Sequence, residues 1–146
     1  RSRGLGDVYK RQYTGNNRTH MIRIPDPGRF ELRLMDGSAN PYLLQASVLA
    51  AGINGIKNKI DPGKPLDCNM YEDFAKYPNL PKLPDELDQS LAQLKQNKEM
   101  NEAFGADVIN SYIKLRSTEI KEFNNIERFD KSKPITKWER QNTLDC

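Results

Sequence analysis

Four arginines and one glutamate lie in two short segments near the start of the chain, and they are the residues best suited to chemistry. Arg18 and Arg23 belong to the first segment, and Arg29, Glu31 and Arg33 belong to the second. Arginine presents a planar fork of donors that pairs with the oxygens of carboxylates and phosphates. The cluster therefore predicts a binding site for anionic ligands.

A β-hairpin is expected to position this cluster. Apolar and polar residues alternate over residues 18–24 and 29–34, and the Asp-Pro-Gly sequence at 26–28 is typical of a turn. Arg18 and Arg23 differ by an odd number of positions, so a regular strand would send them to opposite faces. Either a bulge intervenes, or Arg18 precedes the strand.

The second predicted strand has an apolar face and a charged face. Residue parity places Phe30, Leu32 and Leu34 on one face, and Glu31 and Arg33 on the other. We expect the first face to pack and the second to bind.

A long helix is predicted after the hairpin. Asn40 can cap its free amides and Pro41 suits the first helical position, and we expect the helix to run to about Lys59. Its apolar residues surround the helix axis, which predicts burial on most sides. Gly52 and Gly55 lower helix stability by about 1 kcal/mol each relative to alanine, so we expect another backbone to pass close to them.

The remainder of the chain is predicted as a loop followed by helices. Residues 61–84 are rich in proline and are expected to form a long ordered loop. Two amphipathic helices should begin near Asp85 and Asp107, whereas the conformation around Trp138 is left open. Their apolar faces are expected to consist of Leu87, Leu91 and Leu94 in the first helix and of Val108, Tyr112, Leu115 and Phe123 in the second.

The composition suggests that the chain is incomplete as a folding unit. Only 36% of the 146 residues are hydrophobic and 29% are charged, which is polar for a self-contained core. A two-stranded hairpin is marginally stable in water, and the predicted buried helix has no further strands to cover. We therefore expect an α+β fold in which residues 13–146 are the C-terminal part of a larger catalytic domain.

Charge and cysteine content exclude several classes of protein. The net charge of +3 is too small for a nucleic-acid footprint. Cys68 and Cys146 lack the spacing of a zinc site or of a disulfide framework, which favours a reducing cytoplasm. No apolar run is long enough to span a membrane or to act as a secretory signal.

Residues 1–12 differ from the remainder of the chain. Their sequence, RSRGLGDVYKRQ, shares neither its composition nor its periodicity and resembles translated adapter sequence. We interpret them as a non-native segment; the alternative is a native basic arm.

Five segments in fixed order resemble the end of the glutamine synthetase catalytic domain. The similarity covers residues 13–71 closely and the later helices loosely. Residues 138–140 (WER) and 143–146 (TLDC) are similar to a bacterial subgroup labelled type III. The five segments are Asn17-Arg18, Arg23-Ile24-Pro25, Arg29-Phe30-Glu31-Leu32-Arg33, Ala39-Asn40-Pro41-Tyr42-Leu43, and the run from Ala51 to Lys59.

The resemblance implies ATP-dependent ligation of glutamate and ammonia through γ-glutamyl phosphate. It implies that Glu31 is one ligand of an active-site Mg²⁺ or Mn²⁺ ion, and that Arg33 binds glutamate. It implies that Arg18 contacts glutamate and the transferring phosphate, and that Arg23 contacts the ATP phosphates. Arg18 and Arg33 are thus the implied catalytic residues. The other metal ligands of the family lie upstream, so this chain should bind metal poorly by itself.

The resemblance also implies assembly and regulation. The complete enzyme is expected to form a homo-oligomer, a dodecamer or a similar ring. Tyr71 falls where some bacterial members carry an adenylylated tyrosine, although a loop aromatic can also serve as an anchor. The turn at residues 24–28 is shorter than in the family, at a place where a lysine often comes near the nucleotide.

Alternatives remain at this stage. The acceptor could be methylamine or another amine, or the arginines could form a non-catalytic module that binds an anionic partner such as RNA. Glu31 could simply pair with Arg33 or Arg29 as a solvated salt bridge. The sole histidine, His20, is expected to have a hydrogen-bonded structural role within the first strand.

Overall fold

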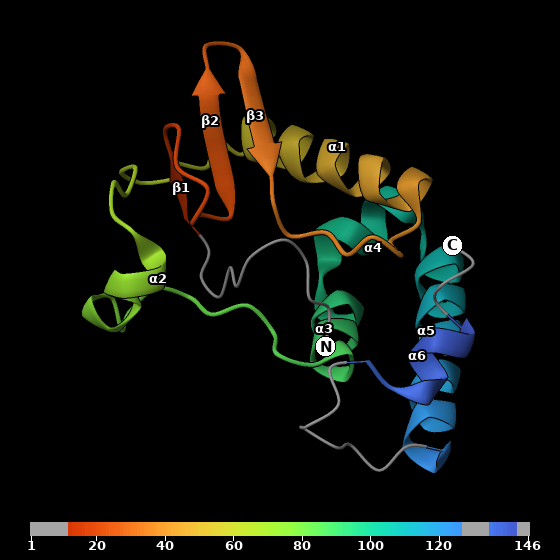
Figure 1. The fold of residues 1–146 in the computed structure, drawn as a ribbon. Coiled ribbons are helices and arrows are strands. Elements are labelled where there is room, and N and C mark those ends of the chain that lie inside the picture. The colour runs from red at the N-terminus through yellow and green to blue at the C-terminus, as the bar shows by residue number, and fades with distance from the viewer. Residues whose placement is uncertain (1–11, 127–134, 143–146) are drawn as a thin grey trace. The chain divides into compact units, whose positions relative to one another are not determined.

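A computed structural model describes residues 12–126 and 135–142 of the chain. The chain divides into two compact units. The first consists of Arg1–Ala39 with Ile60–Pro84, and the second of Asn40–Lys59 with Asp85–Cys146. The first unit carries the strands and the second carries the long helices (Figure 1).

The first unit contains a mixed sheet of three strands, in the order β1-β2-β3. These strands are β1 (Tyr13–Thr14), β2 (Ile22–Asp26) and β3 (Arg29–Leu32); β1 is parallel to β2, and β2 is antiparallel to β3. The predicted hairpin is confirmed, but its strands are shorter than predicted and β1 was not foreseen. The turn depends on Gly28, whose φ of 77° is a conformation that glycine adopts readily.

The segment after residue 60 is bound to the first strand. The Leu66 N–H donates to the Tyr13 carbonyl over 3.0 Å, and the Tyr13 hydroxyl donates to the Gly63 carbonyl over 2.8 Å. This segment contains α2 (Met70–Asp73) and the 3₁₀ helix η1 (Phe74–Lys76). The prediction of one long ordered loop is therefore wrong for residues 70–76, which are helical.

The face of β3 that was predicted to pack is only partly covered. Phe30 is 57% exposed, whereas Leu32 and Leu34 are half-buried. In the described sheet β3 pairs with β2 alone, and a strand that lies beside another does not cover its face. The predicted packing of Phe30 is thus wrong within the described residues.

The second unit begins with α1 (Pro41–Lys57), which starts as predicted. The Asn40 side-chain oxygen accepts hydrogen bonds from Tyr42 N at 3.0 Å and from Leu43 N at 3.1 Å. These bonds satisfy two of the amides that a helix start leaves unpaired. The helix ends two residues before the predicted Lys59, which adopts a positive φ of 50°.

The predicted burial of α1 is not found among the described residues. None of its residues is buried, and the described element that it contacts within its unit is α4. None of the described residues has an atom within 4 Å of a Cβ built on Gly52 or Gly55, so the expected close backbone is absent from the described part of the chain. Four apolar residues at helical spacing, Tyr42, Leu49, Ile53 and Ile56, are instead 50–82% exposed.

Four further helices complete the described part of the second unit. They are α3 (Leu87–Gln96), α4 (Lys98–Phe104), α5 (Ala106–Ile126) and α6 (Lys137–Asn142), of which α4 and α6 were not predicted. Leu91 and Ile109 are the buried apolar residues where α3 and α5 pack. Within the described ranges, no helix has both the length and the apolar character needed to cross a membrane.

The buried face of α5 agrees only in part with the predicted one. Ile109 is 5% exposed, whereas Val108 and Leu115 are about half exposed. Tyr112 and Phe123 of the predicted face are half-buried, so the packed stripe is turned toward Ile109 but still includes these two residues. The predicted stripe on α3 is correct at Leu91, which is 6% exposed.

The structure also supplies a conformation for Trp138, in α6. Its ring meets that of Phe123 on α5 edge to face, with centroids 5.8 Å apart. Thr136 and Glu139 form a reciprocal capping box at the start of α6: Thr136 N donates to Glu139 Oε2 at 2.7 Å, and Glu139 N donates to Thr136 Oγ1 at 3.1 Å.

Candidate functional site

Glu31 lies between two arginines on one face of the sheet. Arg23 and Glu31 are directly paired across β2 and β3, and Arg23 Nη1 donates to Glu31 Oε2 at 2.7 Å. Arg33 Nη1 donates to the other oxygen, Oε1, at 2.5 Å. The Arg33 N–H also bonds to the Met21 carbonyl at 2.9 Å, which continues the antiparallel pairing beyond β3. The predicted shared face of Glu31 and Arg33 is confirmed.

Asn16, in the turn after β1, extends the cluster. Its side-chain oxygen accepts a hydrogen bond from Arg23 Nε at 2.9 Å and another from Arg23 Nη2. Arg23 is therefore held on two sides, by an amide and by a carboxylate. The pattern of the sequence does not single out Asn16, although an asparagine in a turn is a residue that often bonds nearby groups.

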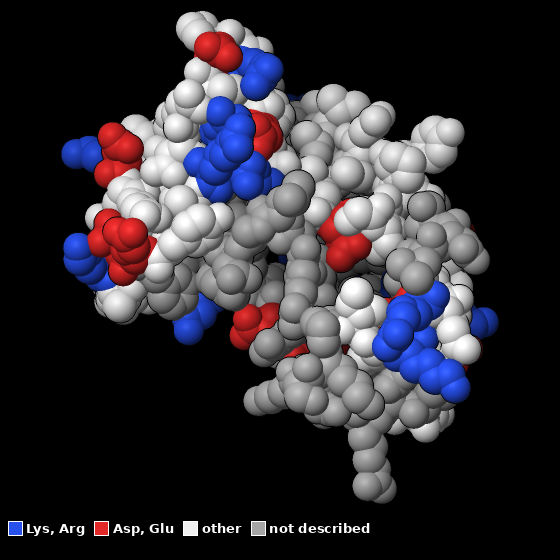
Figure 2. Space-filling view, in the orientation of Figure 1, with Lys and Arg blue, Asp and Glu red and all other residues white. Residues whose placement is uncertain are grey.

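The two arginines are more buried than the carboxylate that they share. The side chains of Arg23 and Arg33 are only 12% and 14% exposed, and that of Glu31 is 36% exposed. Hydrogen bonds from Arg23, and then from Arg33, lower the pKa of Glu31 below its ordinary value. Two guanidinium groups and one carboxylate leave a net charge of 2 − 1 = +1 in the cluster. Figure 2 shows basic side chains gathered beside an acidic one over the strands of the sheet.

The salt-bridge alternative is partly realised. Glu31 pairs with Arg33, as that alternative had it, but its second partner is Arg23 and not Arg29. Arg29 is exposed at the first position of β3. A solvated surface pair contributes little to stability, but these arginines are mostly buried and share one carboxylate. The pairing thus builds a fixed positive site on the sheet.

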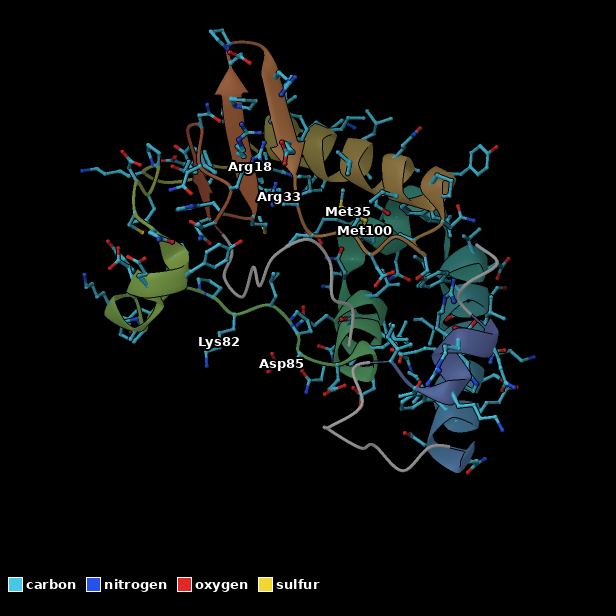
Figure 3. The ribbon with its side chains drawn as sticks, viewed as in Figure 1. Arg18, Arg33, Met35, Lys82, Asp85 and Met100 are labelled. Atoms are coloured by element: carbon cyan, nitrogen blue, oxygen red, sulfur yellow. The ribbon has the colours of Figure 1, made fainter. Side chains whose placement is uncertain are left out.

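Arg18 differs from the other two arginines of the predicted site. It is exposed and precedes β2, so the second of the two alternatives for its position is correct. No hydrogen bond or ion pair among the described residues involves its side chain. Figure 3 labels Arg18 and Arg33, which come from the turn before β2 and from the chain leaving β3.

His20 has the structural role that was predicted, although it lies before β2 and not within the strand. Its side chain is fully buried, and its Nδ1 lies 3.1 Å from the Thr19 hydroxyl oxygen. Burial lowers the pKa of His20 below its ordinary value, because a charged imidazole is less well solvated there. The histidine is thus a neutral part of the core of the first unit near pH 7.

The described residues do not by themselves fit a divalent cation. Glu31 is the one carboxylate of the cluster, and each of its oxygens already accepts a guanidinium bond. No group of three or more His, Cys, Asp or Glu side chains in the described part of the chain is arranged to hold a metal. A Mg²⁺ or Mn²⁺ site needs several oxygen ligands. Ligands from elsewhere would be required.

Comparison with known proteins decides the family. The sequence profile described as glutamine synthetase, catalytic domain, matches residues 7–142. The chain belongs to the glutamine synthetase family. That match starts inside the segment at 1–12 predicted to be adapter-derived, and the origin of this segment stays a prediction.

Curated relatives in this family include ligases for two amines. A glutamine synthetase of Rhizobium meliloti (strain 1021) is 46% identical over 133 residues, which cover 91% of this chain and 29% of that protein. A glutamate–methylamine ligase of Methyloversatilis universalis is 40% identical over 117 residues, which cover 76% of this chain and 25% of that protein. The chain thus spans less than a third of the length of these glutamine synthetase family members.

Solved structures agree with the family assignment. The GmaS/ADP complex in its conformation 1 matches with a TM-score of 0.77 and 39% identity, covering 96% of this chain and 30% of that one. Ligand-free GmaS matches with a TM-score of 0.75 and 40% identity. The α+β fold expected of a piece of the glutamine synthetase catalytic domain is confirmed.

The electrostatics of Glu31 generate a testable prediction. Its carboxyl group should titrate below 4.5, the ordinary value, because both neighbouring arginines favour the charged form. Its stabilising effect is therefore fully present above pH 4.5 and is lost as the pH falls through the lowered pKa. We expect Arg23→Gln to move the pKa back toward 4.5, as measured by carbon-13 NMR titration of the glutamate carboxyl resonances. The exposed Arg140 provides a matched control, Arg140→Gln, and a wild-type midpoint at or above 4.5 would contradict the pairing.

Proposed function

We propose that the chain is the C-terminal part of the catalytic domain of an ATP-dependent glutamate–ammonia ligase. The observation that carries the proposal is the Arg23–Glu31–Arg33 cluster, an ion-paired site of excess positive charge in a member of the glutamine synthetase family. Such a site suits a reaction whose substrates are a nucleoside triphosphate and a dicarboxylic amino acid.

The reaction proceeds in two steps. The γ-phosphoryl group of ATP is transferred to an oxygen of the glutamate side-chain carboxylate, with ADP as the leaving group. The nitrogen of ammonia then attacks the acyl carbon, phosphate leaves, and a proton is lost from the nitrogen. Phosphoryl transfer asks the protein mainly for positioning and for positive charge around the phosphate oxygens. Fixed arginines supply both.

We assign the arginines distinct roles. Arg33 binds the glutamate substrate, Arg23 contacts the ATP phosphates, and Arg18 contacts both glutamate and the transferring phosphate. Three of the five guanidinium hydrogens of Arg23 are used by Asn16 and Glu31, which leaves two for a ligand. The ADP in one of the matching GmaS structures supports a nucleotide site in this part of the family.

Glu31 is proposed as one ligand of a Mg²⁺ or Mn²⁺ ion in the complete enzyme. A carboxylate offers about four lone-pair positions, and the two guanidinium bonds use one on each oxygen. About two lone-pair positions of the Glu31 carboxylate therefore remain for a cation. The other ligands come from chain outside this sequence.

Further parts of the proposal concern the complete protein. We propose a homo-oligomeric enzyme, a dodecamer or a similar ring, and membership of the type III-labelled bacterial subgroup. Residues 143–146, on which that subgroup assignment partly rests, lie outside the described residues. We also propose that residues 1–12 are adapter-derived. A purely anion-binding module, such as an RNA-binding one, is disfavoured by the family and by the net charge of +3.

Methylamine is the second candidate for the acceptor amine. A glutamate–methylamine ligase is 40% identical to this chain, whereas glutamine synthetases of Rhizobium meliloti and Rhizobium leguminosarum are 46% and 43% identical over a longer stretch. The difference favours ammonia. We expect the complete enzyme to have a higher kcat/KM with ammonia than with methylamine, with the amide product identified by mass spectrometry.

Each outcome of this assay bears on the proposal. A preference for methylamine would make the second candidate correct, and an absence of turnover with either amine would contradict both. Residues 13–146 alone are expected to be inactive, because a site with one carboxylate lacks most of the catalytic groups. Turnover by that chain alone would contradict the proposal that the site is completed elsewhere.

Arg33 provides a test of the assigned roles. We expect Arg33→Lys in the complete enzyme to lower kcat/KM for glutamate by roughly 100-fold, because lysine keeps the charge but loses the planar fork. Steady-state kinetics with varied glutamate would measure it. Arg140→Lys, on the exposed face of α6, is the matched control and should leave the kinetics unchanged. Wild-type kinetics in Arg33→Lys would refute the role.

Tyr71 is proposed as a site of adenylylation. It is 54% exposed in α2, which favours access by a modifying enzyme over the alternative of an anchoring aromatic. After incubation of the complete enzyme with a bacterial adenylyltransferase and ATP, we expect an AMP mass shift on the peptide that contains Tyr71. The shift should be absent in Tyr71→Phe. Tyr42 is 82% exposed, so labelling of Tyr42 in preference to Tyr71 would point to exposure alone and contradict a specific site.

A further inference from the structure

Arg18 lies between two side chains that bind a segment some fifty residues further along the chain. The Asn17 side-chain amide donates to the Cys68 carbonyl at 2.9 Å. The Met70 backbone N–H donates to the Thr19 hydroxyl oxygen at 3.0 Å. Arg18 is thus flanked on both sides by anchored neighbours.

The two anchors are also joined to each other. The Asn17 side-chain oxygen accepts a hydrogen bond from Thr19 N at 3.0 Å and lies 2.9 Å from the Thr19 hydroxyl oxygen. This is the pattern of an Asx turn, in which an asparagine side chain fixes the backbone two residues ahead. The backbone of Arg18 is therefore constrained from within the turn as well as from residues 68–70.

Burial protects the anchors from competition by water. Met70 is 5% exposed and the neighbouring His20 is fully buried, while Asn17 and Thr19 are half-buried. A backbone amide that loses its partner in such a place costs free energy, because water does not replace the bond. Arg18 itself is exposed and has no hydrogen bond or ion pair among the described residues. The backbone of Arg18 is thus fixed, while its guanidinium group has no hydrogen bond or ion pair among the described residues.

We propose that Asn17 and Thr19 are positioning residues that fix the Arg18 turn against residues 68–70, so that the Arg18 guanidinium is presented to an anionic substrate at a defined place. The inference rests on the proposed function, since it concerns the group that Arg18 contacts. Neither residue touches the substrate. Holding a charged group before the ligand arrives removes the ordering cost from the binding step.

Thr19 is the better residue to test, because its hydroxyl group can be removed without a change of shape. Thr19→Val in the complete enzyme leaves the Met70 N–H without its partner, and we expect kcat/KM for ATP and glutamate to fall about tenfold. Thr19→Ser keeps the hydroxyl and should restore the kinetics to within about twofold of wild type. Thr118→Val is the matched control: Thr118 is on α5, its hydroxyl donates to the Lys114 carbonyl at 3.0 Å within the same helix, and its loss should change nothing.

A double-mutant cycle separates positioning from general loss of structure. If Thr19 acts through Arg18, then Thr19→Val should have no further effect, to within about twofold, in an enzyme that already carries Arg18→Ala. A tenfold effect in both backgrounds would overturn the proposal, as would a failure of Thr19→Ser to restore activity. Amide hydrogen exchange at Met70 provides an independent readout. It should be slow in wild type and in Thr19→Ser and faster in Thr19→Val, and fast exchange in wild type would also overturn the proposal.

The proposed function and the positioning role can fail separately. If the complete enzyme shows no turnover, the proposed function is wrong, and the same cycle is measured by calorimetry as the affinity for a non-hydrolysable ATP analogue, which carries the γ-phosphate that Arg18 is proposed to contact. A non-additive cycle in the affinity for this analogue would then uphold the positioning of Arg18, and an additive one would refute it. If turnover is present but the kinetic cycle is additive, the positioning role is wrong while the proposed function stands.

Discussion

The shared carboxylate of Glu31 is the interaction on which the site depends. Two mostly buried guanidinium groups, Arg23 and Arg33, face the same side of a small sheet and would repel each other without it. The ion pairs are also tied to the strand register, because Arg23 and Glu31 are directly opposite across β2 and β3. A slip of β3 by one residue would turn Glu31 and Arg33 together to the opposite face and leave Arg23 without a counter-charge. Register and electrostatics therefore select the same structure.

The positive groups of the site are held in two different ways. Arg23 and Arg33 are fixed by side-chain bonds to Glu31 and Asn16, within the sheet. Arg18 is fixed through its backbone, and its side chain is uncommitted among the described residues. Arg23 and Arg33, which are held in place on the sheet, give a constant local electric field. The side chain of Arg18, on a turn, can adjust its position to a group that moves during reaction. This division matches a reaction in which a phosphoryl group passes between two substrates.

The sequence predicted those features that depend on local rules. The alternation in 29–34 was enough to place Glu31 and Arg33 on one face, and the Asn40-Pro41 pair was enough to place the start of α1. The sequence did not predict β1, because a strand of two residues has no periodicity to detect. It missed α4 although its signals were present: Asn97 caps the helix start and Gly105, with a φ of 83°, ends it.

The incorrect predictions mostly concern which residues pack against one another, and less often where a helix or strand lies. The apolar residues of α1 indicate a preference for burial, but the described chain offers α4 as the helix that contacts it. On α5, apolar residues occur on two adjoining stripes, and the choice of Ile109 over Val108 depends on where α3 lies. Likewise, Asn17 and Thr19 gain their roles from residues 68–70, some fifty residues further along the chain. Such long-range pairing is not visible in local periodicity.

The edge-to-face contact of Trp138 with Phe123 has a practical consequence. Trp138 is the only tryptophan of the chain, and it belongs to the second unit, whereas the only histidine, His20, belongs to the first. Indole fluorescence therefore monitors one unit and the imidazole proton resonance monitors the other. A denaturant titration followed by both signals distinguishes a single cooperative transition from two separate ones without any added label.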